Sequence, residues 1–339
     1  MLVTSMIPNP TRDAPNIPSF VAADVGGTHV RVSVVAAAPT CASPPQLLDV
    51  RTYRCADYPS LSTILNDFLG TRSAVRDCVI ASAGFQRSDG TVITTNLPWP
   101  LSPHRLRADL DLAEVSLVND FEALAYATED MEAAQLLHLT GPAKAQDGPR
   151  LLLGPGTGLG AALWIPNNGR PIVLPTEAGQ AALPSTTELE MQLVRHMLNN
   201  RTHVPIEHAL SGPGILNVYR ALCALQSVLP QHASPDAISH AAAAGTDMLS
   251  SQTLEVFCDF LGSIVGDLVM MYGAQGGVYL AGGILPQLRE PLLRSHFVER
   301  FLNKGPMGEA LQHVPVRLIE HGQLGIVGAA RWYLNKKAT

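Results

Sequence analysis

The sequence has few charged residues, few cysteines and no run of basic residues. Only 15% of its 339 residues are charged and 46% are hydrophobic, which is typical of a well-packed globular protein. The formal net charge is −6 and no block of Lys or Arg stands out, so we do not expect a nucleic-acid partner. The five cysteines, at positions 41, 55, 78, 223 and 258, lack CxxC or metal-ligand spacing, which predicts reduced thiols in a cytoplasmic protein.

Segments that would direct the chain to a membrane or out of the cell are also missing. Residues 1–19 lack a basic region followed by an apolar one, which predicts a flexible N-terminal tail and not a secretory signal. The most apolar stretch, residues 260–285, carries Asp267 as its one charge and is broken by Gly-Gly pairs. We therefore predict a helix and then a strand there, and no membrane partner.

Strand-like and helix-like segments alternate along the chain, which predicts an α/β protein. The length is sufficient for two domains with separate cores. We expect a helix over 59–69 with Ser60 or Ser62 as its cap, a buried strand over 77–84 and another strand over 114–120. The pattern of 121–137 predicts one continuous amphipathic helix, long helices follow within 186–270, and 325–335 forms the last helix.

The stretch "DVGGTHVRVSV", residues 24–34, places an acid and two glycines between an apolar run and an alternating one. Two strands joined through Gly26 and Gly27 predict a β-hairpin. This hairpin is either a purely structural turn or a phosphate-binding turn. In the second case its N–H groups face an anion, and Asp24 faces the accompanying metal ion.

A second glycine turn, "GPGTGLGAA", matches the GxGxxG pattern of dinucleotide-binding enzymes from Gly156 onward. A dinucleotide site requires a helix after the glycines, whereas the alternating residues here predict a second strand hairpin. No GxxxxGK[ST] motif occurs, which excludes a Walker-type site. The two Gly-Thr turns could instead converge on one triphosphate, with a third glycine pair, Gly282 and Gly283, close to the nucleoside.

From about residue 20 onward the sequence resembles the bacterial glucokinases of the hexokinase branch, within the sugar kinase/actin-like ATPase superfamily. The resemblance rests on the motifs "ADVGGTHVR", "TTNLPWPLS", "LVNDFEALA", "GPGTGLGAA", "LPTEAGQ", "EHALSGPGILNVYRAL", "GGVYLAGGI" and "HGQLGIVGAA". It implies a two-domain actin-like ATPase (ribonuclease H-like) fold with an interdomain cleft. We expect a small α/β domain of residues 20–130 plus 321–339, and a large α/β domain of 131–320.

The resemblance implies that the protein is a cytoplasmic, homodimeric enzyme of glycolysis that phosphorylates the 6-hydroxyl of glucose with ATP and Mg²⁺. A carboxylate must then accept the hydroxyl proton. Asp120 carries that role in the family, although an Asn-Asp pair between a strand and a helix could also be a helix cap. The sugar-binding residues carried over are Asn96, Asn119, Asp120, Glu177, Gln180 and Glu207. The predicted nucleotide-binding residues are Ala23, Asp24, Val25, Gly26, Gly27, Thr28, Gly156, Thr157, Gly158, Gly282 and Gly283, with Asp24 also binding the metal.

One position departs from the family pattern. Where the family reads Glu-Gly-Gly-His, this chain reads Glu177-Ala178-Gly179-Gln180. Gln180 offers a donor and an acceptor but does not ionise, so it can pair with a sugar hydroxyl in a different way from the family histidine. A hexose kinase of altered preference and a weakly catalytic sugar sensor are therefore the alternatives. The three histidines at 196, 203 and 208 lack metal-ligand spacing, which predicts surface positions.

Overall fold

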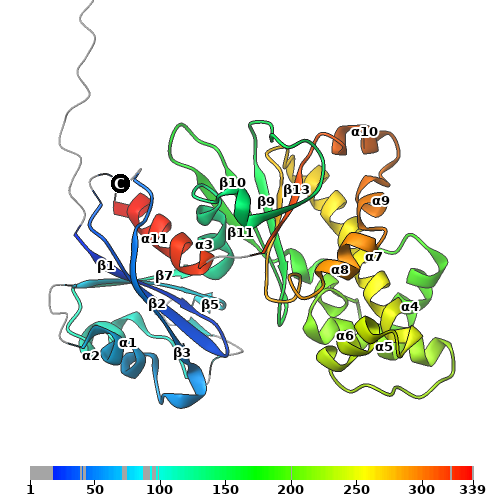
Figure 1. Cartoon of the computed structure of the whole chain (residues 1–339), viewed down its shortest axis with the longest axis horizontal. Coiled ribbons are helices and arrows are strands. Elements are labelled where there is room, and N and C mark those ends of the chain that lie inside the picture. The colour runs from blue at the N-terminus through cyan, green and yellow to red at the C-terminus, as the bar shows by residue number, and fades with distance from the viewer. Residues whose placement is uncertain are drawn as a thin grey trace, which may run out of the picture. The chain divides into compact units, whose positions relative to one another are not determined.

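The chain divides into two compact units in a computed structural model (Figure 1). Unit 1 comprises Met1–Asp130 with Gln323–Thr339, and unit 2 comprises Met131–Gly322. The structure describes residues 18–38, 40, 43–70, 75–86, 92–93, 97, 99–199, 201–320 and 323–337. Most of the predicted N-terminal tail, residues 1–17, and the candidate sugar ligand Asn96 lie outside these residues.

Unit 1 is built on a five-stranded sheet in the order β3-β2-β1-β4-β7. The strands β1, β2 and β3 are antiparallel neighbours, and β4 and β7 run parallel to β1. The predicted hairpin around Gly26 and Gly27 and the two predicted strands are thereby confirmed, and β4 is largely buried as expected. Their bounds are β1 (Phe20–Val25), β2 (His29–Val35), β3 (Leu47–Arg54), β4 (Asp77–Ser82) and β7 (Glu114–Asn119), with the short pair β5 (Phe85–Gln86) and β6 (Val92–Ile93) outside the sheet.

Helices cover both faces of this sheet because successive side chains of β1 point to opposite sides. Val21, Ala23 and Val25 pack in one core with α1 (Leu61–Leu69) and α2 (Pro103–Asp109). Phe20 and Ala22 pack in a second core with α3 (Asp120–Ala127) and α11 (Leu324–Lys337). Ser60 caps α1, as one of the two predicted options, and a single turn, η1 (Cys55–Asp57), follows β3.

Unit 2 repeats the same strand arrangement with one strand added. Its six-stranded sheet has the order β11-β10-β9-β12-β13-β8. The strands β9, β10 and β11 are antiparallel neighbours, β12 and β13 run parallel to β9, and β8 is antiparallel to β13. The bounds are β8 (Leu136–Thr140), β9 (Arg150–Pro155), β10 (Leu159–Ile165), β11 (Ile172–Thr176), β12 (Val278–Leu280) and β13 (Val316–Ile319).

The helices of unit 2 form the larger core with this sheet, and α7 is its longest member. They are α4 (Glu188–Leu198), α5 (Gly212–Leu225), α6 (Pro235–Ala244), α7 (Met248–Tyr272), α8 (Arg289–Arg294), α9 (Phe297–Leu302) and α10 (Gly308–Leu311). Short 3₁₀ turns are η2 (Ala133–Gln135), η3 (Ala178–Gln180), η4 (Ile206–His208) and η5 (Gly305–Met307). The predicted helix and strand within 260–285 are confirmed, since α7 ends at the left-handed Gly273 before β12 begins.

The prediction of one helix over 121–137 is wrong. The helix α3 ends at Ala127, and residues 136–140 form β8, which pairs with β13 at the edge of the unit 2 sheet. The leucines of this stretch fit either a helical or an extended pattern. The segment forms a strand because Leu136 pairs with Ile319 of β13, which is far away in the sequence.

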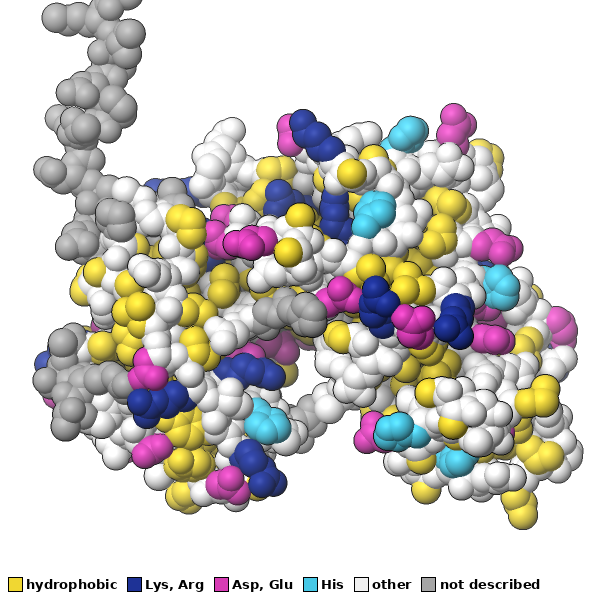
Figure 2. Space-filling model, in the orientation of Figure 1, with side chains coloured by type: hydrophobic (Ala, Val, Ile, Leu, Met, Phe, Trp, Pro, Cys, Tyr) yellow, Lys and Arg dark blue, Asp and Glu magenta, His cyan; other side chains and the backbone are white. Residues whose placement is uncertain are grey.

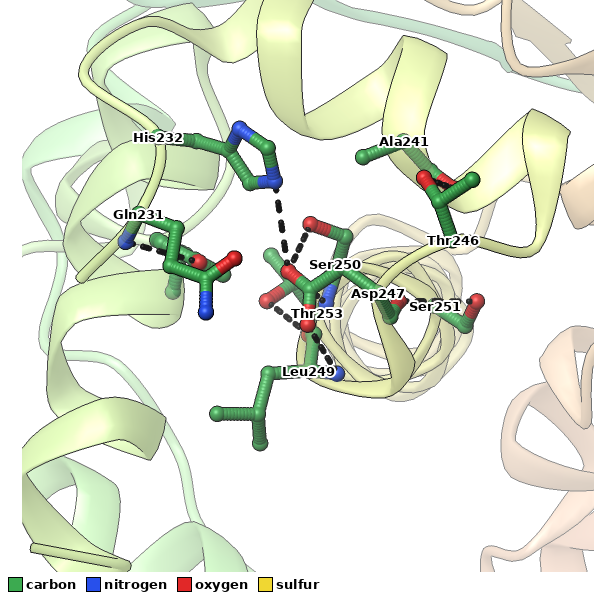
Figure 3. Close-up of polar contacts among 10 residues, drawn as sticks. Gln231, His232, Ala241, Thr246, Asp247, Leu249, Ser250, Ser251 and Thr253 are labelled. Atoms are coloured by element: carbon green, nitrogen blue, oxygen red, sulfur yellow. Dashed lines mark hydrogen bonds and ion pairs between the residues drawn. The ribbon is translucent and has the colours of Figure 1, made fainter. Parts of the chain in front are cut away.

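Asp247 organises the start of α7 (Figure 3). Its carboxylate accepts the backbone N–H of Leu249 at 3.1 Å, the N–H of Ser250 at 3.2 Å and the Ser250 hydroxyl at 2.6 Å. The ring of His232, from the loop between α5 and α6, lies 3.5 Å from the same carboxylate. Burial opposes ionisation of Asp247, but the bonds from Ser250 and Leu249 outweigh it and lower its pKa.

Oppositely charged side chains lie beside one another on the face of the molecule shown in Figure 2. In unit 2, Arg289 pairs with Glu290 and with Glu320, and Arg294 pairs with Glu290. Within the described ranges, no helix has both the length and the apolar composition that crossing a membrane would require.

Candidate functional site

The turn between β1 and β2 presents an open backbone in unit 1. Gly26, Gly27 and Thr28 are exposed, and the Gly26 N–H closes the turn on the His29 carbonyl at 3.0 Å. Cys55 holds the turn through two hydrogen bonds. Its N–H donates to the Thr28 carbonyl at 2.9 Å, and its thiol donates to the Gly26 carbonyl at 3.3 Å. An exposed glycine turn held in this way can bring its backbone close to an anion.

Asp24, near the end of β1, has the properties of a residue that would hold a cation. Burial raises its pKa, while Arg31, with its Nη1 atom 3.2 Å from the carboxylate, opposes that rise. A methyl group on Gly325 would lie 2.4 Å from the carboxyl carbon, so α11 packs directly against this side chain. A Mg²⁺ ion beside Asp24 would offset the cost of burying its charge. Such an ion needs only one or two carboxylates when phosphates and water complete its shell.

Asn119 and Asp120 lie at the same edge of this sheet as the glycine turn. Val25 of β1 is in register with Ser82 of β4, which is in register with Asn119 of β7, and all three strands are parallel. The two segments are therefore two strand spacings, or about 10 Å, apart along the sheet edge. Unit 1 thus brings together Asp24, the exposed turn and Asp120.

The pair at the start of α3 also has the cap role that the sequence left open. The Asn119 side-chain oxygen accepts the N–H groups of Phe121 at 2.9 Å and Glu122 at 3.1 Å. Phe121 N–H also lies 2.9 Å from the Asp120 carboxylate. With its oxygen engaged in the cap, the Asn119 amide nitrogen is the group that can bind a ligand. The other two predicted residues of this unit, Ala23 and Val25, are buried in β1 and offer only their backbone.

In unit 2 the other two glycine segments lie side by side. The β9–β10 turn contains Gly156, Thr157 and Gly158, and it joins two strands as predicted, so it does not open a helix as a dinucleotide motif would. Gly282 has φ +93°, and a methyl group there would lie 2.4 Å from the Pro155 carbonyl oxygen. Gly156 and Gly283 have open space where a side chain would be. The backbones of the two segments can therefore approach one ligand together.

Glu207 and Gln180 form the polar centre of a cavity in unit 2. The Gln180 side-chain amide donates to Glu207 Oε1 at 2.8 Å, and the Leu159 N–H donates to Oε2 at 3.3 Å. A methyl group on Gly158 would lie 2.7 Å from Oε2, so the carboxylate lies directly against the backbone of this turn. The cavity has a volume of about 660 Å³ and is lined by Thr157, Gln180, Arg201, Thr202, His203, Pro205, Glu207, His208, Ser211, Pro213 and Asn217.

Glu177, which directly precedes η3, is exposed at the end of β11 and does not line the cavity. The expectation of surface positions holds for His196 and His203, which are exposed, but is wrong for His208. His208 is half-buried and lines the same cavity as Glu207. The available signal was its position next to Glu207 in the "EHALSGPG" motif. The part of the chain that the structure describes contains no cluster of three metal-ligating side chains.

The chain matches the glucokinase family model over residues 21–336. It is 98% identical over 334 residues to a protein of Xylella fastidiosa (strain Temecula1) named "glucokinase-like protein", covering 98% of this chain and 100% of that one. The crystal structure of a glucokinase from an Antarctic psychrotroph is 32% identical with a TM-score of 0.82, covering 93% of this chain and 98% of that one.

A ROK family glucokinase of Streptomyces griseus, solved in complex with glucose and AMPPNP, is 20% identical with a TM-score of 0.54. The superposition covers 93% of this chain and 98% of the Streptomyces chain. At 20% identity this similarity is evidence for the fold alone. The expected actin-like ATPase fold is confirmed by these neighbours and by the two sheets of related strand order. The family model matches nearly the whole chain, and the fold places the glycine turns at the ends of sheet strands. This chain is therefore an enzyme of the glucokinase family.

Proposed function

We propose that the protein transfers the terminal phosphoryl group of ATP to the 6-hydroxyl of glucose, which yields glucose 6-phosphate and ADP. The observation that carries the proposal is the edge of the unit 1 sheet, where the exposed Gly26–Thr28 turn, the half-buried carboxylate of Asp24 and Asp120 lie together. Phosphoryl transfer needs these three elements: phosphate donors, a metal-holding acid and a group that accepts the hydroxyl proton.

The nucleotide is bound by both glycine turns in this proposal. The N–H groups of Gly26 and Gly156 close the two turns, so the backbone N–H groups that follow them, of Gly27, Thr28 and the Thr157–Gly158 segment, bind phosphate oxygens. Gly283 leaves room for the nucleoside, and Gly282 allows the close approach of this segment to Pro155. Asp24 would be the residue that holds Mg²⁺. The ion supplies charge neutralisation of the phosphates when it is bound. Ala23 and Val25 contribute to the turn through their backbone.

Asp120 is the general base that accepts the proton of the sugar hydroxyl as the oxygen attacks phosphorus. Its place in the first turn of α3, on a rigid strand-helix connection, fixes the carboxylate for this task. The backbone N–H of Phe121 donates to the carboxylate at 2.9 Å, which helps to hold it in position.

Glucose is held by Asn119, Asp120, Glu177, Gln180 and Glu207, with Asn96 as a further candidate outside the described residues. Each buried hydroxyl without a partner would cost about 1–3 kcal/mol, so several such side chains are needed. The Gln180 amide already donates to Glu207, which keeps that carboxylate oriented without an ionisable neighbour at position 180. This arrangement favours an active kinase with altered sugar preference over a sensor that barely turns over. We also propose a cytoplasmic homodimer acting in glycolysis.

The test is a coupled ADP-release assay with ATP, Mg²⁺ and a panel of hexoses. We expect turnover with glucose, and we expect Asp120→Asn to lower kcat by at least about 100-fold. Asp236→Asn is the matched control, since Asp236 also lies in the first turn of a helix, α6, but outside the site. An Asp120→Asn variant with full turnover would refute the base assignment, and absence of sugar-dependent ADP release from the wild-type protein would refute the function.

A further inference from the structure

His208 occupies a position in the cavity that the sequence did not assign. It follows Glu207 directly in η4 and lines the same cavity as Glu207 and Gln180. Its imidazole Nδ1 lies 3.2 Å from the side-chain nitrogen of Asn217, and that same nitrogen donates to the His208 carbonyl at 3.0 Å. Asn217 is located on α5 and lines the cavity as well.

These two contacts fix which ring nitrogen of His208 carries the proton. The Asn217 atom that faces a backbone carbonyl must be the NH₂ nitrogen, because an amide oxygen there would repel the carbonyl oxygen. The Nδ1 atom faces this donor, so it must be the acceptor, and the proton of the neutral ring lies on Nε2. Among the described residues, Nε2 has no hydrogen-bond partner of its own.

The charges around His208 favour the neutral ring. Burial lowers its pKa first, and the nearby Arg201 lowers it further, against the opposing effect of Glu207. A neutral His208 therefore offers one N–H donor in the same cavity in which Glu207 offers only acceptors. Neighbouring hydroxyls of a sugar can use such a pair, one as donor to the carboxylate and the other as acceptor from the ring.

We propose that His208, oriented by Asn217, is a specificity-determining residue that donates a hydrogen bond to a hydroxyl next to the one bound by Glu207. The ligand class is a sugar with adjacent hydroxyls. This inference rests on the sugar site of the proposed function, and it assigns Asn217 as a positioning residue that acts through His208.

Calorimetric titration of the full-length protein with glucose and its monodeoxy analogues tests this inference without requiring turnover. We expect His208→Ala to raise the Kd for glucose about ten-fold, the loss of one hydrogen bond, and to leave the Kd unchanged for the analogue that lacks the contacted hydroxyl. Asn217→Leu should weaken glucose binding similarly, and the double variant should lose no more than either single variant. His196→Ala, on the exposed side of α4, is the control and should bind as the wild-type protein does.

Three results would overturn the inference. They are a loss of affinity in His208→Ala that is the same for all the sugars, an unchanged Kd for glucose in that variant, and a wild-type protein that binds no sugar. If His208→Ala does not fold, His208→Gln carries the test, because its amide retains an N–H donor and should keep more of the affinity than Asn217→Leu does. If the expected binding pattern is found but no ADP is released, the inference stands and the proposed kinase function fails.

Discussion

Replacing Arg300 with methionine should strongly destabilise unit 2, because it leaves a buried carboxylate without its counter-charge. Arg300, on α9, donates to Glu190 Oε1 of α4 at 2.5 Å, and the two side chains are only 9% and 4% exposed. The other carboxylate oxygen accepts the N–H groups of Thr186 at 2.7 Å and Thr187 at 3.1 Å, which caps α4. Removing one partner of such a pair costs about 3–5 kcal/mol.

The second variant separates charge burial from lost packing. In Glu190→Gln/Arg300→Met the side-chain oxygen of position 190 still accepts the two threonine N–H groups, but no charge is buried. We expect the double variant to be more stable than Arg300→Met alone by at least about 1 kcal/mol. Arg294→Met is the matched control, since Arg294 is 81% exposed in its pair with Glu290 and its loss should cost less than about 1 kcal/mol.

Urea unfolding followed by far-ultraviolet circular dichroism measures these differences as shifts of the midpoint at constant slope. A separate transition for each unit would be fitted separately. The reasoning is refuted if Arg300→Met is no less stable than Arg294→Met. It is also refuted if neutralising Glu190 in the double variant makes the protein less stable than Arg300→Met.

Three further changes test other contacts of unit 1. Gly328→Ala should destabilise the protein by about 3 kcal/mol or more in urea unfolding, because the new methyl group would lie 1.9 Å from the Ala123 carbonyl oxygen where α11 crosses α3; wild-type stability would contradict this packing. The two lysines that end α11 lower the pKa of Glu114 to about 2, so its stabilisation is present at neutral pH and is lost as the pH falls from its ordinary pKa towards 2. Glu114→Gln should thus lower the free energy of unfolding by about 1 kcal/mol or less at pH 7 and leave it unchanged near pH 2. A loss of stability that does not depend on pH would exclude the ion pairs. Cys55→Val removes the thiol donor to the Gly26 carbonyl, so it should raise the KM for ATP about three- to five-fold and leave the KM for glucose unchanged. Cys55→Ser keeps a donor and should change the KM for ATP less. Equal effects on the KM of both substrates would argue against a role of Cys55 in the nucleotide turn.

Local patterns were sufficient for several parts of the fold. An apolar run before Gly26 and Gly27 and an alternating one after them predicted the first hairpin, and a serine ahead of an apolar helical stretch predicted the cap of α1. These features are decided within a few residues, where side-chain periodicity and turn conformation act directly. The segment 136–140 was mispredicted because its leucines suit helix and strand alike, and only its remote partner β13 distinguishes them.

The sequence by itself determined the family and the existence of two glycine-bearing hairpins, because those signals lie in short continuous motifs. Only the tertiary structure decided which neighbours each candidate residue has: Gly282 against Pro155, the Gln180 amide on Glu207, and Asn217 on His208. The first two contacts join separate segments of the chain, and the third joins η4 to the α5 helix nine residues later. They arise from the parallel pairing of β9 with β12 and from the packing of η4 against both η3 and α5, which no local spacing of residues encodes.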